Sequence, residues 1–365
     1  MIPTTFFRSS SIREFCDCKM RYFANYCLGL RQPSGPAALL GTAFHLVMEV
    51  LANCKMDLQS DSPKYQYYDK ETGCGATYKT IEDVNVEELT KCVYDQMINS
   101  IDIARVPPSY HRKTELGSKK AWLPYKKLKD SVTNVFQMGP RSFDVRKMHI
   151  VATEQKFDIE IREPWARYNF DFRGRNYKGY LRIRGSIDLI VQNEDGTMSI
   201  IDWKTGVTAN MSTGIDKEYE DFAGDLQMSM YYLATRRYLG FDVSDVTLCF
   251  PNENKVFTLY FDEDLVLDRI RSIYEEMKNT PHPTKTESQF CKLYCPYFKQ
   301  SFHDVKTKPL VKAKDYYWEE DGEIVQKSMR ICNQLEKYFL AGFTPLEVMN
   351  ALARYNHKVE LYTNW

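Results

Sequence analysis

Two carboxylates and a lysine lie near the middle of the sequence, in a pattern that can support metal chemistry. Asp188 ends the motif Gly185-Ser186-Ile187-Asp188, and Asp202 and Lys204 follow on either side of a tryptophan. Carboxylate oxygens hold hard divalent cations, a bound cation activates water, and a lysine stabilises developing negative charge. These residue types are the minimal set for metal-assisted hydrolysis of a phosphodiester.

The residues around this set predict a β-hairpin. Residues 182–192 and 197–203 are rich in β-branched and aliphatic side chains, and the turn sequence Asn193-Glu194-Asp195-Gly196 separates them. Alternation along the second strand places Asp202 and Lys204 on one face. Because an Asp-x-Lys pattern is common, an ordinary solvated face is an equal alternative to a metal site. The apolar surroundings favour the metal site, since a buried unpaired carboxylate is costly.

The hairpin register decides whether the two carboxylates can cooperate. If Glu194-Asp195-Gly196 is a three-residue loop with its glycine in the left-handed region, Asn193 pairs with Thr197. That register places Asp188 opposite Asp202, on the same face of the sheet. A two-residue loop would put the carboxylates on opposite faces and remove the metal site.

Length and composition indicate a globular protein without a bulk electrostatic preference for nucleic acid. The chain has 365 residues, with 49 basic and 49 acidic side chains. We see no signal peptide and no apolar run long enough to span a bilayer, so we expect a soluble protein of a reducing intracellular compartment, without a membrane partner. The ten cysteines are then expected as buried thiols or metal ligands rather than disulfides.

The pattern along the chain predicts an α/β fold, with a central mixed sheet flanked by helices. We expect helices at 9–28, 38–54, 222–239 and 262–279, and strands at 149–162, 182–192, 197–203, 245–250 and 255–261. Residues 1–304 would form one domain that contains a largely helical insertion at 55–148, with a helix at 86–104. Residues 305–365 would form a helical C-terminal extension.

Two pairs at helical spacing add weaker signals. His45 and Glu49 share one face of a predicted helix, as do Gln227 and Tyr231 in a later one. Alone, such a histidine is more often a core residue than a ligand, and the second pair reads as an ordinary amphipathic stripe.

Taken in order, these motifs resemble the RecB-like branch of the PD-(D/E)XK nuclease superfamily, which includes the AddB nuclease domain and the iron–sulfur nucleases of CRISPR adaptation. The family pattern is a G-x-x-x-H helix, a strand glutamate, G-x-x-D, D/E-x-K and Q-x-x-x-Y. The matching residues are Gly41 with His45, Glu154, Gly185 with Asp188, Asp202 with Lys204, and Gln227 with Tyr231. The resemblance covers roughly residues 9–300 and implies a restriction-endonuclease-like core.

The resemblance also implies roles for individual residues. The ligands of Mg²⁺ or Mn²⁺ would be His45, Asp188 and Asp202, and an imidazole among oxygen ligands suits Mn²⁺ as well as Mg²⁺. Lys204 would be the catalytic lysine. Gln227 and Tyr231 would position the substrate and the active-site water.

Members of this branch often join their N- and C-terminal ends through a [4Fe–4S] cluster held by one early and three late cysteines. Cys18 matches the early position, and Cys291 and Cys295 match the start of the late group. The sequence departs from the pattern, because the late spacing is C-x3-C and Ser301 occupies the third late position. Cys16 or His303 could supply the fourth ligand.

Such a set could hold a [4Fe–4S] cluster or zinc, or be the remnant of a lost site with buried thiols. The remaining cysteines lack a partner spacing and are expected to be packing residues: Cys27, Cys54, Cys74, Cys92, Cys249 and Cys332.

Two basic segments could contact DNA. Residues 162–184 interleave arginines with aromatic side chains, a combination that grips phosphates and stacks bases, and residues 111–130 carry a weaker basic stretch. The alternative for 162–184 is a solvated hairpin whose aromatic side chains pack beneath the sheet.

Together these observations predict a Mg²⁺- or Mn²⁺-dependent deoxyribonuclease, an end-directed exonuclease rather than a site-specific endonuclease, with DNA ends as its partner. No helicase P-loop is present, so any unwinding would come from a helicase or recombination partner. Two alternatives remain: an inactive DNA-binding or scaffold protein that keeps the fold, and an unrelated metalloenzyme acting on small molecules.

Overall fold

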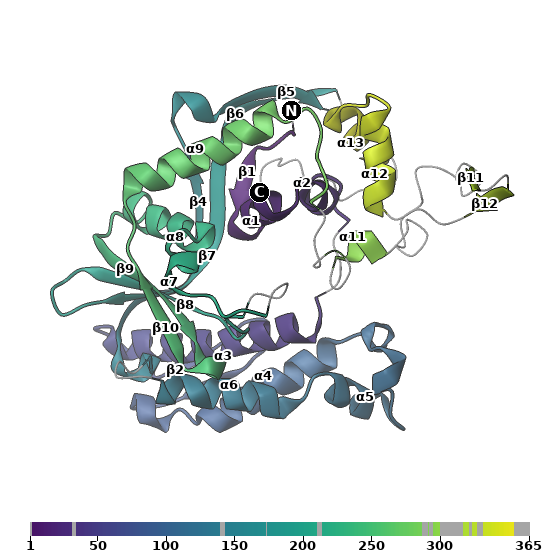
Figure 1. The fold of residues 1–365 in the computed structure, drawn as a ribbon. Coiled ribbons are helices and arrows are strands. Elements are labelled where there is room, and N and C mark those ends of the chain that lie inside the picture. The colour runs from purple at the N-terminus through teal and green to yellow at the C-terminus, as the bar shows by residue number, and fades with distance from the viewer. Residues whose placement is uncertain are drawn as a thin grey trace.

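A six-stranded mixed sheet lies between two layers of helices (Figure 1). The computed structural model describes residues 2–30, 34–138, 143–172, 174–209, 214–286, 291, 295–299, 317–320, 323–326 and 331–353. The predicted α/β class, a mixed sheet flanked by helices, is confirmed.

The sheet has the order β1-β7-β8-β9-β10, with β4 on the other side of β7. Its strands are β1 (Phe6–Arg8), β4 (His149–Glu160), β7 (Arg182–Gln192), β8 (Met198–Trp203), β9 (Val243–Phe250) and β10 (Lys255–Leu259). The β1–β7 and β8–β9 pairs are parallel, and the other pairs are antiparallel. Strand β1 was not predicted from the sequence, because three residues are too short for a periodic signal.

Strand β7 changes its neighbour along one side. Strand β4 pairs with β7 along its full length, whereas β1 pairs only with residues 182–184 and β8 only with residues 189–192. The motif Gly185-Ser186-Ile187-Asp188 therefore lies between the segment that pairs with β1 and the segment that pairs with β8. On that side of β7 the motif has no neighbouring strand. The backbone of this motif is therefore unpaired on that side within the ladder.

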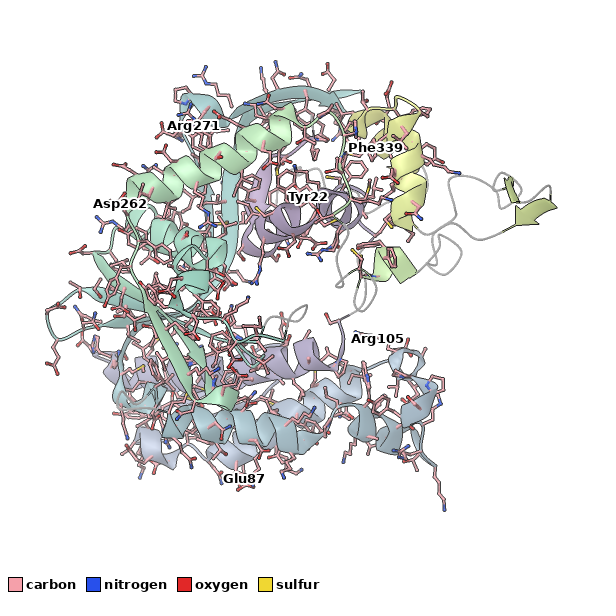
Figure 2. All side chains as sticks on the ribbon, in the orientation of Figure 1. Tyr22, Glu87, Arg105, Asp262, Arg271 and Phe339 are labelled. Carbon is pink, nitrogen blue, oxygen red and sulfur yellow. A yellow bond between two sulfur atoms is a disulfide. The ribbon has the colours of Figure 1, made fainter. Side chains whose placement is uncertain are left out.

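Helices from both ends of the chain cover one face of the sheet. They are α1 (Ser9–Asp17), α2 (Lys19–Tyr22) with a π-helical turn (Phe23–Cys27), α7 (Tyr219–Ala223), α8 (Leu226–Arg237), α9 (Glu263–Asn279), α11 (Pro296–Lys299), α12 (Ile331–Leu340) and α13 (Pro345–Ala353). Side chains from this layer form the first hydrophobic core, to which the labelled Tyr22 and Phe339 belong (Figure 2).

The opposite face is covered by α3 and by the insertion. The helices here are α3 (Pro36–Gln59), α4 (Val86–Ser100), α5 (Glu115–Trp122) and α6 (Tyr125–Gln137), and they form the second core. Strand alternation divides the sheet between the cores, since Ile190 and Ile200 belong to the first and Ile201 and Trp203 to the second. Burial on both faces explains why these strands are apolar almost throughout.

Helix α3 corrects one expectation from the sequence. This 24-residue helix contains an 18-residue window with a mean hydropathy of 1.5, which is long and apolar enough to cross a membrane by length and composition alone. In this fold 44% of that window is buried inside the protein. The helix packs Phe44 and Val47 into the second core, so its apolar content serves internal packing.

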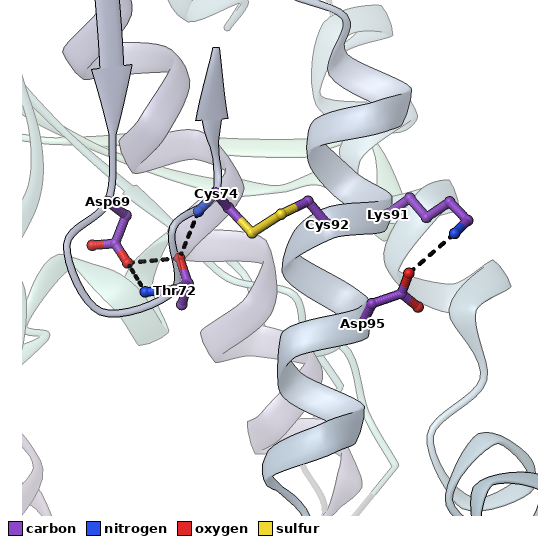
Figure 3. The surroundings of a disulfide bond; sticks show 6 residues. All are labelled: Asp69, Thr72, Cys74, Lys91, Cys92 and Asp95. Carbon is purple, nitrogen blue, oxygen red and sulfur yellow. Dashed lines mark hydrogen bonds and ion pairs between the residues drawn. A yellow bond between two sulfur atoms is a disulfide. The ribbon is translucent and has the colours of Figure 1, made fainter.

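The insertion contains a feature that the sequence did not predict. Its hairpin of β2 (Gln66–Tyr68) and β3 (Gly75–Thr77) brings Cys74 against α4, where it forms a disulfide with Cys92 (Figure 3). The expectation that both cysteines are free packing thiols is therefore wrong. A spacing of 18 residues between two cysteines matches no recognisable motif. The two thiols come together only because the hairpin packs on the helix.

The aromatic side chains of residues 162–184 pack inward. These residues form β5 (Arg167–Phe172) and the paired β6 (Arg175–Tyr180), in which Phe170 and Phe172 are buried in the first core. Of the two alternatives for this segment, the structure supports the hairpin with packed aromatics. In the C-terminal tail, the described residues form a hairpin of β11 (Tyr317–Glu320) and β12 (Glu323–Gln326) in addition to α12 and α13.

Candidate active site

The hairpin has the register on which a shared metal site depends. The Asn193 amide donates to the carbonyl of Thr197 at 2.9 Å, and Gly196 has a φ of 85°. The ladder runs through the Leu189–Ile201 pair, so Asp188 and Asp202 occupy the next opposed positions. The predicted three-residue loop is confirmed.

Three possible metal ligands meet beside the stretch of β7 that has no neighbouring strand on one side. Ligand atoms of His45, Glu154 and Asp188 all lie within 4.8 Å of one another. The Nδ1 atom of His45 is 3.3 Å from Oδ2 of Asp188 and 3.9 Å from Oε1 of Glu154. Burial lowers the pKa of His45, which keeps the imidazole neutral and able to act as a ligand near pH 7. An imidazole with two carboxylates is a donor set that suits Mg²⁺ or Mn²⁺.

Glu154 belongs to this group, although the sequence did not place it among the metal ligands. It has a φ of 43°, in the left-handed region that residues other than glycine seldom adopt. Its Oε2 accepts a hydrogen bond from the Ser186 hydroxyl at 2.8 Å. A backbone outlier in the middle of a strand is often found at a functional site, and here it accompanies a carboxylate directed at His45 and Asp188.

Asp188 is held in a low-dielectric environment. Its side chain is 7% exposed, and its Oδ2 accepts a hydrogen bond from the Trp203 amide at 3.1 Å. Burial, and then the charge of Asp202, raise its pKa well above the usual value. A bound cation would offset both effects, because it favours the ionised carboxylate.

Asp202 is paired with the lysine. Asp202 is 1% exposed, and its Oδ2 lies 2.6 Å from Nζ of Lys204. Oδ1 receives no hydrogen bond from any group in the described part of the chain. A buried carboxylate oxygen without a donor is costly, so this atom fits a site that receives a cation or an ordered water. Asp202 lies outside the group of three whose ligand atoms are within 4.8 Å.

Lys204 connects the carboxylates to α8. Burial would lower its pKa, but the charges of Asp202 and Asp188 raise it overall, so the side chain carries a proton at neutral pH. Its ammonium group donates to Oε1 of Gln227 at 3.0 Å, and Nε2 of Gln227 donates to the Tyr231 hydroxyl at 2.6 Å. The sequence named all three of these residues, and the structure brings them into one hydrogen-bonded chain.

The sequence matches the family described as the PD-(D/E)XK nuclease superfamily over residues 9–299. The chain belongs to this superfamily. Membership indicates a nuclease, and nucleases of this superfamily use divalent metal ions. A solved structure titled "Crystal structure of SSO0001" is 14% identical, with a TM-score of 0.23, and the match covers 72% of this chain and 98% of that one. No curated protein matches this chain.

Two motif glycines of this PD-(D/E)XK nuclease permit close approaches to the site. A Cβ atom at Gly185 would lie 2.6 Å from the ring of Phe157, which packs edge-to-face on Tyr231. A Cβ atom at Gly41 would lie 3.2 Å from Oγ1 of Thr205, the residue after Lys204. The absence of a side chain at Gly185 thus leaves room on β7 for the Phe157 ring of β4 and the Tyr231 ring of α8.

A cavity of about 610 Å³ opens beside these candidate site residues of the PD-(D/E)XK protein. His45 and Lys204 line one part of it, and Cys18, Cys291 and Cys295 line another. The structure therefore brings the early cysteine and two late cysteines to the same cavity as His45, one of the candidate metal ligands.

Cys332 on α12, which the sequence assigned to packing, lies near two of these cysteines. Burial, and then the neighbouring Cys295, raise its pKa to about 11, and Cys291 acts on it in the same direction. All three late cysteines contact the first core. The signal that was overlooked is their number, because Cys291, Cys295 and Cys332 are the only cysteines after Cys249.

Cys16 has different surroundings from this group. It is exposed on α1, and the charged groups that act on it include Glu276 and Arg269 of α9. The structure does not bring it to the cavity that Cys18 lines. Ser301 and His303, the other candidates at this end of the chain, lie outside the described residues.

Proposed function

We propose that this protein is a divalent-metal-dependent deoxyribonuclease that acts on DNA ends as an exonuclease. The observation that carries the proposal is the convergence of His45, Glu154 and Asp188 within 4.8 Å, beside the Asp202–Lys204 pair and at a cavity. The order of the five motifs, which resembles that of RecB-like exonucleases, supports exonuclease action.

The residues present fit a divalent cation. The chemistry that such an ion supplies when bound is activation of water and neutralisation of phosphate charge. His45, Glu154 and Asp188 would hold it, and the unpartnered Oδ1 of Asp202 is available to a ligand or to a water on the same face.

The lysine then acts on the substrate. Lys204 is protonated, so it can stabilise the negative charge that develops on the scissile phosphate, or orient the attacking water by donating to it. Gln227 holds the ammonium group in place, and Tyr231 holds the amide of Gln227. Because donors fixed before the reaction need no reorganisation, this chain of contacts favours the transition state.

The second candidate is a DNA-binding scaffold that has lost activity. Superfamily folds become inactive when the lysine or an acid is lost, whereas here Lys204 lies 2.6 Å from Asp202 and both acids are present. The complete set of groups favours the enzyme. We propose that any strand separation comes from a separate helicase or recombination protein.

A cleavage assay tests this function. Single- and double-stranded oligonucleotides labelled at the 5′ or the 3′ end are incubated with Mg²⁺, Mn²⁺ or EDTA, alongside covalently closed circular DNA. We expect metal-dependent cleavage of the linear substrates and survival of the circles. Asp202→Asn and Lys204→Ala should each lower the rate by about 10²-fold or more, and Lys178→Ala, an exposed lysine on β6, should leave it unchanged.

Binding of DNA by the wild-type protein without cleavage under any metal would instead support the scaffold. Cleavage of closed circles at a rate similar to that of linear DNA would remove the exonuclease assignment and leave the nuclease.

We also propose that Cys18, Cys291, Cys295 and Cys332 hold a [4Fe–4S] cluster. Cys18, Cys291 and Cys295 line the cavity, and Cys295 and Cys291 both influence the pKa of Cys332, which supports one early and three late ligands. Among the described residues no three sulfur atoms lie within 4.8 Å of one another. One zinc ion needs sulfurs about 3.8 Å apart, given bonds of about 2.3 Å, so these thiols are not arranged for a single zinc ion.

Anaerobic purification followed by absorbance near 400 nm and analysis of iron, sulfide and zinc tests this assignment. Cys332→Ser should lose the iron, and Cys16→Ser should retain it. Loss of iron from Cys16→Ser but not from Cys332→Ser would identify Cys16 as the fourth ligand. A wild-type protein that contains no iron and still cleaves DNA would show that the thiols are packing residues.

A further inference from the structure

We propose that Arg13 and Lys217 form a phosphate-binding pair that holds the DNA strand beside the catalytic centre. Arg13 lies on α1, and Lys217 lies in the segment that joins β8 to α7; neither belongs to the five motifs of the superfamily match. Both side chains line the cavity that His45 and Lys204 also line. The proposal rests on the proposed nuclease function and identifies which groups grip the substrate.

The cationic side chains of the cavity differ in how strongly they are already paired. Arg21 also lines the cavity, but its guanidinium is 3.2 Å from Glu14 and 2.8 Å from Asp17. Within the described part of the chain, Arg13 has one distant pair, with Asp225 at 4.0 Å, and its side chain is 58% exposed. Arg13 can therefore turn to a phosphate at little cost, whereas Arg21 would first lose two carboxylates.

Lys217 faces Arg13 without a close counter-charge. Its Nζ lies 5.5 Å from the centroid of the Phe222 ring, and within the described ranges no carboxylate lies in ion-pairing distance of it. Burial, and then the charge of Arg13, lower the pKa of Lys217, and these effects exceed the opposing influence of Asp225, Asp221 and Asp17. Two neighbouring cations repel each other, and an anion bound between them would relieve that repulsion.

The segment that carries Lys217 is anchored to the sheet. The Lys217 amide donates to the carbonyl of Thr208, whose own amide and hydroxyl donate to the Glu253 carboxylate at 2.8 and 2.6 Å. Lys255 donates to Asp216, the residue before Lys217, at 2.7 Å. These contacts hold the lysine at the cavity before DNA arrives, so little ordering entropy is lost on binding.

The catalytic centre needs such a pair because it is surrounded by acids. Glu154, Asp188 and Asp202 converge there, and a DNA strand brings one further negative charge with each nucleotide. Arg13 and Lys217 offset this repulsion at phosphates next to the scissile one. They contact no reacting atom, so they are binding residues rather than catalytic ones.

The test measures how DNA affinity depends on salt. Full-length wild-type protein and Arg13→Gln/Lys217→Gln are titrated in EDTA, which prevents cleavage, against a 5′-labelled single strand at several KCl concentrations, with anisotropy as the readout. The variant should bind at least about tenfold more weakly at low salt. Its plot of log affinity against log salt should be shallower by about 1.4, since each phosphate contact to a single strand contributes about 0.7.

Matched controls separate this pair from general charge. Arg175→Gln/Lys178→Gln removes two exposed positive charges from β6, away from the cavity, and should keep the wild-type slope. With metal present, the Arg13/Lys217 variant should show a raised KM and an almost unchanged kcat. Lys217→Gln alone should lower the slope by about 0.7. This single variant replaces the double variant in the test if the double variant does not fold.

An unchanged slope in a variant that still binds DNA would overturn the pair, and so would an equal fall in the β6 control. A wild-type protein that neither binds nor cleaves DNA would overturn the nuclease function itself. Cleavage by the wild type together with an unchanged variant slope would overturn the pair alone.

Discussion

The Nδ1 atom of His45 lies 3.3 Å from Oδ2 of Asp188, with burial acting on both side chains. Burial lowers the pKa of the imidazole and raises that of the carboxyl, so each group favours its neutral form without a metal. A divalent ion needs the neutral imidazole and the ionised carboxylate. The histidine is therefore ready to bind, and the aspartate must release its proton first.

Metal binding should accordingly be coupled to proton release from Asp188. As pH rises through the raised pKa of this carboxyl, the proton that competes with the metal is lost, and affinity for Mn²⁺ or Mg²⁺ should increase. Isothermal titration calorimetry in buffers of different ionisation enthalpy gives the number of protons released. In Asp188→Asn this contribution should disappear, and an equal proton release in the variant would exclude Asp188 as its source.

The same carboxyl should make the metal-free protein less stable as pH rises. Its pKa is higher in the folded chain than in the unfolded chain, so between these values the folded state binds more protons and the free energy of unfolding falls with increasing pH. At pH 8 without metal, Asp188→Asn should be more stable than wild type by about 1 kcal/mol or more, and it should gain nothing from added Mn²⁺. Urea unfolding with and without EDTA measures both effects, and a destabilised metal-free variant would contradict them.

The contacts of Gln227 should matter more for catalysis than those of Tyr231. Gln227→Ala removes the acceptor 3.0 Å from the Lys204 ammonium, so the lysine loses its fixed position, and kcat should fall by about 10²-fold. Tyr231→Phe removes only the hydroxyl that supports the Gln227 amide, and about a tenfold fall is expected. Single-turnover cleavage at saturating DNA measures both. A larger effect for Tyr231→Phe would mean that its hydroxyl contacts substrate directly.

The parts of the site that local sequence determines were predictable. The turn Asn193-Glu194-Asp195-Gly196 requires one left-handed residue, and glycine supplies it, so the register that opposes Asp188 and Asp202 followed from turn chemistry alone. The i, i+4 spacing of Gln227 and Tyr231 likewise predicted their shared helix face, and they form a hydrogen bond.

Features that depend on tertiary packing were not predictable. The sequence singled out Glu154 only as the strand glutamate of the family pattern, and its left-handed φ and its approach to His45 arise from the pairing of β4 with β7. The Cys74–Cys92 disulfide requires a hairpin to pack on α4. Cys332 lies near Cys295 and Cys291 because α12 packs into the first core, and its distance along the sequence does not indicate that proximity.

The glycine at position 185 provides the sharpest test of how packing supports the site. A methyl group there would lie 2.6 Å from the Phe157 ring, closer than real Cβ contacts allow, and that ring packs on Tyr231 at a centroid distance of 6.0 Å. Gly185→Ala should therefore cost about 1–3 kcal/mol in stability and slow cleavage by displacing Tyr231. Gly206→Ala, where a Cβ atom meets nothing within 4 Å, is the matched control for stability.

Phe157→Leu in the Gly185→Ala background should relieve the clash, because the shorter side chain frees the space that the ring tip occupies. The double variant should be more stable than the sum of the two single effects predicts, a coupling of about 0.5 kcal/mol or more, and it should recover part of the lost rate. Thermal unfolding and cleavage rates of the four proteins measure this cycle. If the two changes in the free energy of unfolding are strictly additive, residues 157 and 185 do not clash in the Gly185→Ala variant, and the motif glycine has a different role.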